Sequence, residues 1–99
     1  MFHKCLDHMQ LRVHLKISGR VQGVCFRHYC RMQAERLGLN GMVRNNDDGS
    51  VEVIAEGGEE AVGNFIALCR RGPPAAVVKA CEEKHEPVTG EFDSFTIGF

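Results

Sequence analysis

The sequence predicts an α+β fold of the α/β class, a two-layer sandwich in which two helices cover one face of a mainly antiparallel sheet of four to five strands. Three observations support this prediction. Apolar and polar residues alternate over residues 11–18, apolar residues recur at helical spacing in two later segments, and glycine or proline follows each helical segment. The resulting element order, with a short extra strand at the end, is the βαββαβ order of ferredoxin-like sandwiches.

The first strand and the first helix have the clearest patterns. In the strand, apolar Leu11, Val13, Leu15 and Ile17 alternate with polar Arg12, His14, Lys16 and Ser18. We expect the apolar set to face the core and the polar set to face solvent. Helical spacing then relates Phe26, Tyr29, Cys30, Gln33, Ala34 and Leu37, and Gly38 ends this helix.

A hairpin is predicted in the middle of the chain. Residues 41–46 and 50–56 form its two strands, and Gly57–Gly58 is expected to end the second of them. The connection over residues 46–49 reads Asn-Asp-Asp-Gly and carries the Asp-Gly turn signal. We therefore interpret Asp47 and Asp48 as turn formers rather than as an acid–base pair.

The last third of the sequence predicts a helix and two weaker strands. The helix is indicated by Val62, Phe65, Ile66 and Cys69, with Glu59 and Glu60 in its first turn and Arg70 and Arg71 in its last. Gly72-Pro73-Pro74 ends it. Charged residues interrupt the apolar face of residues 77–86, so we expect an edge strand there, and residues 92–97 form a short final strand.

Length and composition limit the class of function. The 99 residues suffice for one domain, which we place at residues 11–99 behind a polar lead-in over residues 1–10. A net charge of −1 provides no field to attract nucleic acid or an anionic membrane. The N-terminus lacks the pattern of a secretory signal, and no apolar run approaches the ~20 residues that span a bilayer. We expect a monomer that binds a small molecule.

Cysteine usage indicates the compartment. The chain has an odd number of cysteines without a CxxC pair, namely Cys5, Cys25, Cys30, Cys69 and Cys81. A disulfide framework is therefore not expected, and a reducing, cytoplasmic location fits better.

The most informative stretch runs from Gly19 to Arg27, directly after the first strand and into the first helix. Its glycines allow backbone N–H groups to turn into a concave anion cradle, to which the helix N-terminus adds its positive dipole end. Arg27 can hold a phosphate with two hydrogen bonds. The pattern indicates binding of a phosphoryl group.

Asn45 is predicted to join this loop in space. A right-handed crossover through the first helix makes the first two strands parallel, so their C-terminal ends lie at the same end of the sheet. An amide side chain can hold a water molecule through its donor and its acceptor. A water held beside a bound phosphate is what in-line hydrolysis requires.

Two motifs resemble the signatures of the acylphosphatase family. Residues 19–27 are similar to its first signature and residues 43–52 to its second, and the likeness extends from about Leu11 to Phe99. It implies hydrolysis of an acyl phosphate to a carboxylate and inorganic phosphate, without a metal or a cofactor. By that likeness, Asn45 orients the attacking water and Arg27 is the second catalytic residue. The same likeness implies that the phosphate, or a similar anion, is held by Gln22, Gly23, Val24, Cys25, Phe26 and Arg27.

Three positions depart from what the family pattern leads us to expect. Cys25 stands in the loop where glycine or another uncharged residue is expected; a thiolate there would repel phosphate, whereas a neutral thiol would add only bulk. We predict an oxidation-sensitive loop. Met42 and His85 stand where aromatic residues are expected, which concerns packing rather than chemistry.

Parts of the sequence are also compatible with other functions. Cys25 and Arg31 have the C-x5-R spacing of cysteine-dependent phosphatases, but the residues between them are predicted to be helical. His3, Cys5 and His8 could bind a metal, although a polar lead-in without supporting partners favours adventitious binding. A regulatory domain that binds phosphorylated small molecules stays open, and it would keep Arg27 yet tolerate loss of Asn45. An accessory domain for carbamoyl-phosphate chemistry is less expected, because the sequence up to Phe99 shows no attached domain that would support it.

Overall fold

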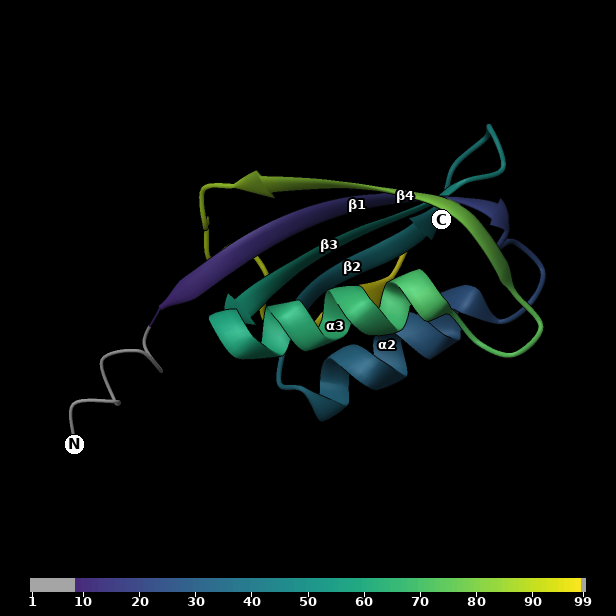
Figure 1. Cartoon of the computed structure of the whole chain (residues 1–99). Coiled ribbons are helices and arrows are strands. Elements are labelled where there is room, and N and C mark those ends of the chain that lie inside the picture. Colours follow the sequence, from purple (N-terminus) through teal and green to yellow (C-terminus); the bar gives the residue numbers. More distant parts are fainter. Residues whose placement is uncertain (1–8, 99) are drawn as a thin grey trace.

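Five strands form one sheet with the order β4-β1-β3-β2-β5, and two helices cover one of its faces (Figure 1). The computed structural model describes residues 9–98. Its elements are β1 (Gln10–Arg20), α2 (Phe26–Arg36), β2 (Asn40–Asn45), β3 (Val51–Gly58), α3 (Glu59–Arg71), β4 (Val77–Glu86) and β5 (Phe95–Ile97). The ferredoxin-like α+β sandwich predicted from the sequence is confirmed, and β4 is an edge strand as expected.

The strand directions bring two distant segments together. Both β1 and β2 pair antiparallel with β3, so they run parallel to each other, and β5 adds a parallel pairing with β2. The C-terminal end of β2 therefore lies at the same end of the sheet as the loop between β1 and α2 (Figure 1). This confirms the geometric basis on which the sequence predicts Asn45 near that loop.

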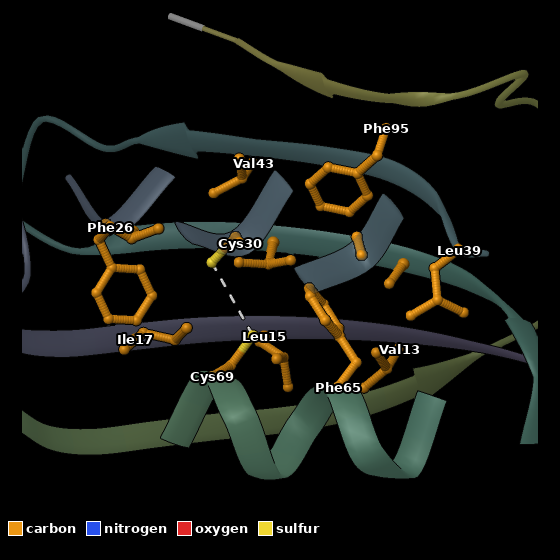
Figure 2. Packing of buried hydrophobic residues seen from close by; sticks show 14 of the residues in the cluster. Val13, Leu15, Ile17, Phe26, Cys30, Leu39, Val43, Phe65, Cys69 and Phe95 are labelled. Atoms are coloured by element: carbon orange, nitrogen blue, oxygen red, sulfur yellow. Dashed lines mark hydrogen bonds between the residues drawn. The ribbon is translucent and has the colours of Figure 1, made fainter. Parts of the chain in front are cut away.

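The core lies between the sheet and the helices. Val13, Leu15 and Ile17 of β1 are fully buried beneath the helices, as their alternation predicts. On the helices, Phe65 packs its ring edge-to-face on Phe95 of β5, with centroids 5.8 Å apart, and Cys30 and Cys69 meet with sulfurs 4.0 Å apart (Figure 2). Burial of each large side chain contributes roughly 1.5–3 kcal/mol, so this layer accounts for most of the driving force for folding.

Several predicted boundaries are wrong, each because long-range pairing overrides a local signal. β3 does not stop at Glu56 but includes Gly57 and Gly58, since both glycines pair with the first residues of β1. Gly57 also makes room for the side chain of Leu39. β1 runs two residues beyond Ser18 because β4 pairs with it across a bulge at Ser18/Gly19. A Cβ at Gly19 would lie 2.2 Å from the carbonyl oxygen of Val77.

The expectation that Arg12 faces solvent is also wrong. Its side chain points away from the helices, but only 9% of the residue is exposed. The segment before β5 covers it: Phe92, predicted to lie in the last strand, stacks on the guanidinium 5.6 Å from its ring centroid, and β5 begins only at Phe95. Of the two departures that concerned packing, Met42 is half-buried and His85 is exposed, within 2.7 Å of Glu83.

Candidate active site

A hollow of ≈ 430 Å³ opens at the end of the sheet where β1 and β2 finish. Its lining comes from the β1–α2 loop, the first turn of α2, the end of β2 and the end of β5, namely Val21, Gly23, Cys25, Phe26, Arg27, His28, Asn45 and Ile97. The fold thus brings Arg27 and Asn45 into one cavity although they lie eighteen positions apart in sequence.

The loop backbone turns sharply and leaves several N–H groups without a partner in the part of the chain that the structure describes. Gly23 and Cys25 both have left-handed backbone angles, with φ of 75° and 63°, which bends the chain between them. Within residues 9–98, the backbone N–H groups from Gln22 to Phe26 donate no hydrogen bond to the protein. α2 begins directly at Phe26, and the side chain of Cys25 does not cap it, so the positive end of the helix is open to the hollow.

Arg27 occupies a position that helix stability does not favour. It lies in the first turn of α2, where a cation opposes the helix dipole, and that turn contains no acidic residue. One guanidinium nitrogen, Nη1, donates to the carbonyl oxygen of Gly98 at 3.3 Å. No side chain among residues 9–98 forms an ion pair with it. The remaining donors of its planar fork can hold a bidentate anion.

Asn45 is the last residue of β2 and has an unusual side-chain environment. Its Oδ1 is buried, and it is the one buried side-chain polar atom of the described residues that has no hydrogen-bond partner. Leaving a buried acceptor unpaired costs about 1–3 kcal/mol. Such an atom is suited to accept a hydrogen bond from a molecule that enters the hollow.

The remaining predicted phosphate-binding residues divide into two groups. Gly23, Cys25, Phe26 and Arg27 line the hollow, whereas the side chains of Gln22 and Val24 do not. Val24 is half-buried against the core, and Gln22 donates hydrogen bonds to the β2–β3 hairpin. These two can therefore contribute only their backbone N–H groups to an anion in the loop.

Sequence reasoning missed part of the lining. From its place early in the first helix, His28 could tune the pH response of the site, but it was not included among the predicted site residues, although it lines the hollow. Ile97 reaches the hollow from β5 because β5 pairs with β2, and no local pattern indicates that pairing.

The hairpin beside Asn45 is held by its own hydrogen bonds. Asp48 accepts from the backbone N–H of Ser50 at 2.9 Å and from its Oγ at 2.6 Å, and Lys16 lies 3.0 Å away. The bonds from Ser50, with help from Lys16, hold the pKa of Asp48 well below its usual range. Asp48 is therefore ionised and engaged in the turn, which leaves it unsuited to act as a general acid.

The C-x5-R alternative does not fit the structure. The residues between Cys25 and Arg31 are helical, and Arg31 Nε lies 4.0 Å from Glu35 one turn further along α2. A cysteine-dependent phosphatase needs these residues in a loop around the anion, so this alternative is wrong. His3, Cys5 and His8 lie outside the described residues, and residues 9–98 contain no group of three or more potential metal ligands.

Comparison with known proteins decides the family. The sequence model of the acylphosphatase family matches residues 13–97. The chain belongs to the acylphosphatase family. It is 49% identical over 86 residues to an acylphosphatase of Methylococcus capsulatus, a match that spans 87% of this chain and 94% of that protein.

Solved structures agree with the family assignment. The crystal structure of an acylphosphatase from Bacillus subtilis superposes with a TM-score of 0.86 at 35% identity, over 90% of this chain and 99% of that one. Full-length HypF in its phosphate- and nucleotide-bound form contains a similar unit, with a TM-score of 0.84 at 28% identity, over 92% of this chain but 12% of HypF.

Family membership fixes the reaction class. The chain is a hydrolase that acts on acyl phosphates, and its substrate is accordingly a small molecule with a carboxylic–phosphoric anhydride. Neither helix of the described residues has the length and apolar character needed to cross a membrane.

Proposed function

We propose that Arg27 and the N–H groups of Gln22 to Phe26 bind the phosphoryl group of the substrate, while Asn45 orients the water that attacks it. The observation that carries the proposal is the buried, unpartnered Oδ1 of Asn45 in the hollow that Arg27 also lines. The oxygen accepts a hydrogen bond from the water and aims it at phosphorus, and the loop holds the phosphoryl oxygens still.

The reaction then needs positioning and charge stabilisation more than a strong base. The water oxygen forms a bond to phosphorus in line with the acyl oxygen, and the bond between phosphorus and that oxygen breaks. The carboxylate leaves with the electron pair, and the water's proton passes to a phosphoryl oxygen of the substrate itself. Each well-placed donor to the developing charge is worth on the order of 10²–10³ in rate, which Arg27 and the loop N–H groups can supply.

The reaction we propose uses no metal and no cofactor. A carboxylate is a good leaving group, so the transition state is loose and its charge resides mainly on the phosphoryl oxygens. Arg27 offers a planar guanidinium fork that fits two of those oxygens. The unpaired N–H groups of the loop donate hydrogen bonds to the third phosphoryl oxygen.

The setting we propose is a cytoplasmic monomer that does not bind nucleic acid. The net charge of −1 supports the absence of nucleic acid. Cys25, Cys30, Cys69 and Cys81 are free thiols, which supports a reducing compartment. Sedimentation at working concentration tests the monomer, and a dimer would contradict it.

The experiment is hydrolysis of benzoyl phosphate in the presence of a chelator, with the unmodified chain, Asn45→Ala and Asn40→Ala. Asn40 is an exposed asparagine at the other end of β2, so it is a matched control. We expect Asn45→Ala to lower kcat by on the order of 10²-fold while the inhibition constant of inorganic phosphate stays nearly unchanged. Asn40→Ala should behave like the unmodified chain.

Two results would count against this assignment. Normal turnover by Asn45→Ala would remove Asn45 from the chemistry. Inhibition by the chelator would show that a metal takes part.

A further inference from the structure

The side chain of Gln22 connects the two halves of the active site. Its Nε2 donates to the carbonyl oxygen of Asn46 at 2.8 Å and to that of Ser50 at 2.9 Å. One primary amide thus uses both of its hydrogens to bridge segments 24 and 28 positions away in sequence.

The two acceptors form the neck of the β2–β3 hairpin. The carbonyl of Ser50 also accepts from the N–H of Asn46 at 2.8 Å, and the carbonyl of Asn46 also accepts from the N–H of Gly49 at 3.2 Å. Ser50 is only 3% exposed, so this neck is anchored in the fold. The residue that precedes the neck is Asn45, whose backbone pairs with Val51 across the hairpin.

The structure offers little else to fix the loop against the hairpin. Within residues 9–98, the two bonds from Gln22 are the only hydrogen bonds between residues 21–25 and residues 45–50. The loop itself contains Gly23, which is exposed, and Cys25 in a left-handed conformation, so its own backbone does not make it rigid.

We infer that the side chain of Gln22 is a positioning residue that sets the distance between the bound phosphoryl group and the water held by Asn45. This rests on the proposed roles of the loop and Asn45 and adds the element that couples them. In-line attack requires the reacting atoms to approach within about 3–3.5 Å, and a misplacement of ~1 Å can cost on the order of 10²-fold in rate. Two hydrogen bonds to the hairpin neck, one of them to the residue next to Asn45, control that distance.

The inference predicts a split between turnover and anion binding. Gln22→Met keeps the length of the side chain and the backbone N–H but removes both donors. We expect kcat for benzoyl phosphate to fall by about tenfold or more, while the inhibition constant of inorganic phosphate changes by less than about threefold. Gln33→Met is the matched control, because Gln33 lies on α2 away from the hollow and only accepts a surface hydrogen bond from Arg36.

A double-mutant cycle separates positioning from loop construction. If Gln22 acts through Asn45, then adding Gln22→Met to Asn45→Ala should lower kcat only slightly further, because no water is oriented in that variant. The inference would be overturned if Gln22→Met lowered kcat by the same factor in the unmodified chain and in Asn45→Ala. Normal turnover by Gln22→Met would overturn it as well. A parallel loss of phosphate affinity would show that the side chain builds the anion cradle instead.

Two precautions keep the outcomes distinct. Normal turnover by the single variant Asn45→Ala would contradict the proposed function. If Asn45→Ala is impaired and its effect on kcat simply adds to that of Gln22→Met, only the inference about Gln22 is contradicted. If Gln22→Met does not fold, Gln22→Asn provides the same test, because its amide is one methylene too short to reach both carbonyls. Retained kcat in folded Gln22→Asn would then overturn the inference.

Discussion

The polar groups at the two ends of β1 differ in their hydrogen bonding within the described residues: those near its start are paired, and those beyond its end are not. Near its start, the guanidinium of Arg12 donates to Glu56, Glu86, Thr89 and Glu91 over 2.7–3.1 Å. Beyond its other end, the loop N–H groups and Oδ1 of Asn45 have no partner within residues 9–98. Leaving the buried Oδ1 of Asn45 unpaired has a cost, which supports the proposal that a bound molecule supplies the missing partner at this end.

At the Arg12 end of β1, hydrogen bonds to Glu56 fix the segment that follows β4. Burial alone would raise the pKa of Glu56, but hydrogen bonds from the N–H of Thr89, from Arg12 and from the N–H of Gly90 lower it to about 2. These bonds hold the segment that follows β4 over the outer face of the sheet. One end of this small domain therefore contributes stability, whereas the other leaves polar groups free for the binding that we propose. Four substitutions test that division.

The largest effect is expected from Arg27→Ala at the binding end. Loss of the fork should lower kcat/KM for benzoyl phosphate by on the order of 10³ and weaken inhibition by inorganic phosphate, because charge-assisted bonds to the phosphoryl group are lost in both states. Steady-state kinetics measures both. Arg31→Ala, one turn further along α2, is the control. Unchanged phosphate inhibition in Arg27→Ala would place the anion elsewhere.

Glu56→Gln should affect stability and leave chemistry intact. The substitution leaves buried Arg12 with one charged partner fewer, so we expect a loss of about 2 kcal/mol at pH 7. The folded pKa of Glu56 lies below its unfolded value, so its contribution is complete above pH ~5 and is lost as pH falls towards 2. Urea unfolding at pH 7 and pH 3 should therefore show a smaller difference at pH 3. Exposed Glu82→Gln is the control, and a pH-independent difference would contradict this account.

Cys25→Gly tests whether the binding end holds strain. A non-glycine residue at φ 63° lowers the free energy of unfolding by about 1 kcal/mol. Glycine removes this strain, but its greater conformational freedom in the unfolded state offsets part of the gain. A small gain in stability is expected, with activity retained. Since Cys25 is exposed in the hollow, peroxide should inhibit the unmodified chain and spare Cys25→Gly. Full activity of the unmodified chain after peroxide would refute the oxidation-sensitive loop.

The smallest effect is expected from Lys16→Met, which lies between the two ends. The ion pair of Lys16 with Asp48 joins two side chains that are about half exposed, and water screens such pairs. Asp48 also keeps both hydrogen bonds from Ser50. The urea midpoint and kcat should match those of the unmodified chain within error. A clear loss of kcat would mean that the hairpin depends on Lys16 as well as on Gln22.

Much of the fold could be predicted because its signals are local. Alternation identified β1, helical spacing identified both helices, and the Asp-Gly turn identified the hairpin. The convergence of Asn45 with the loop could be predicted too, because the handedness of a strand–helix–strand crossover restricts the topology. The continuation of β3 through Gly57–Gly58 could not, since glycine is normally a break and only the pairing with β1 keeps these residues extended.

The sequence by itself determined the element types, and it predicted the phosphate-binding loop and the two side chains to which we assign the chemistry. Only the tertiary structure decided that Arg12 is buried, that Gln22 bonds to the hairpin and that Oδ1 of Asn45 has no partner. The physical reason is the distance along the sequence over which each interaction acts. Periodicity and turn chemistry are set within a few residues, whereas the pairing of each polar group depends on which distant segment the packed sheet brings beside it.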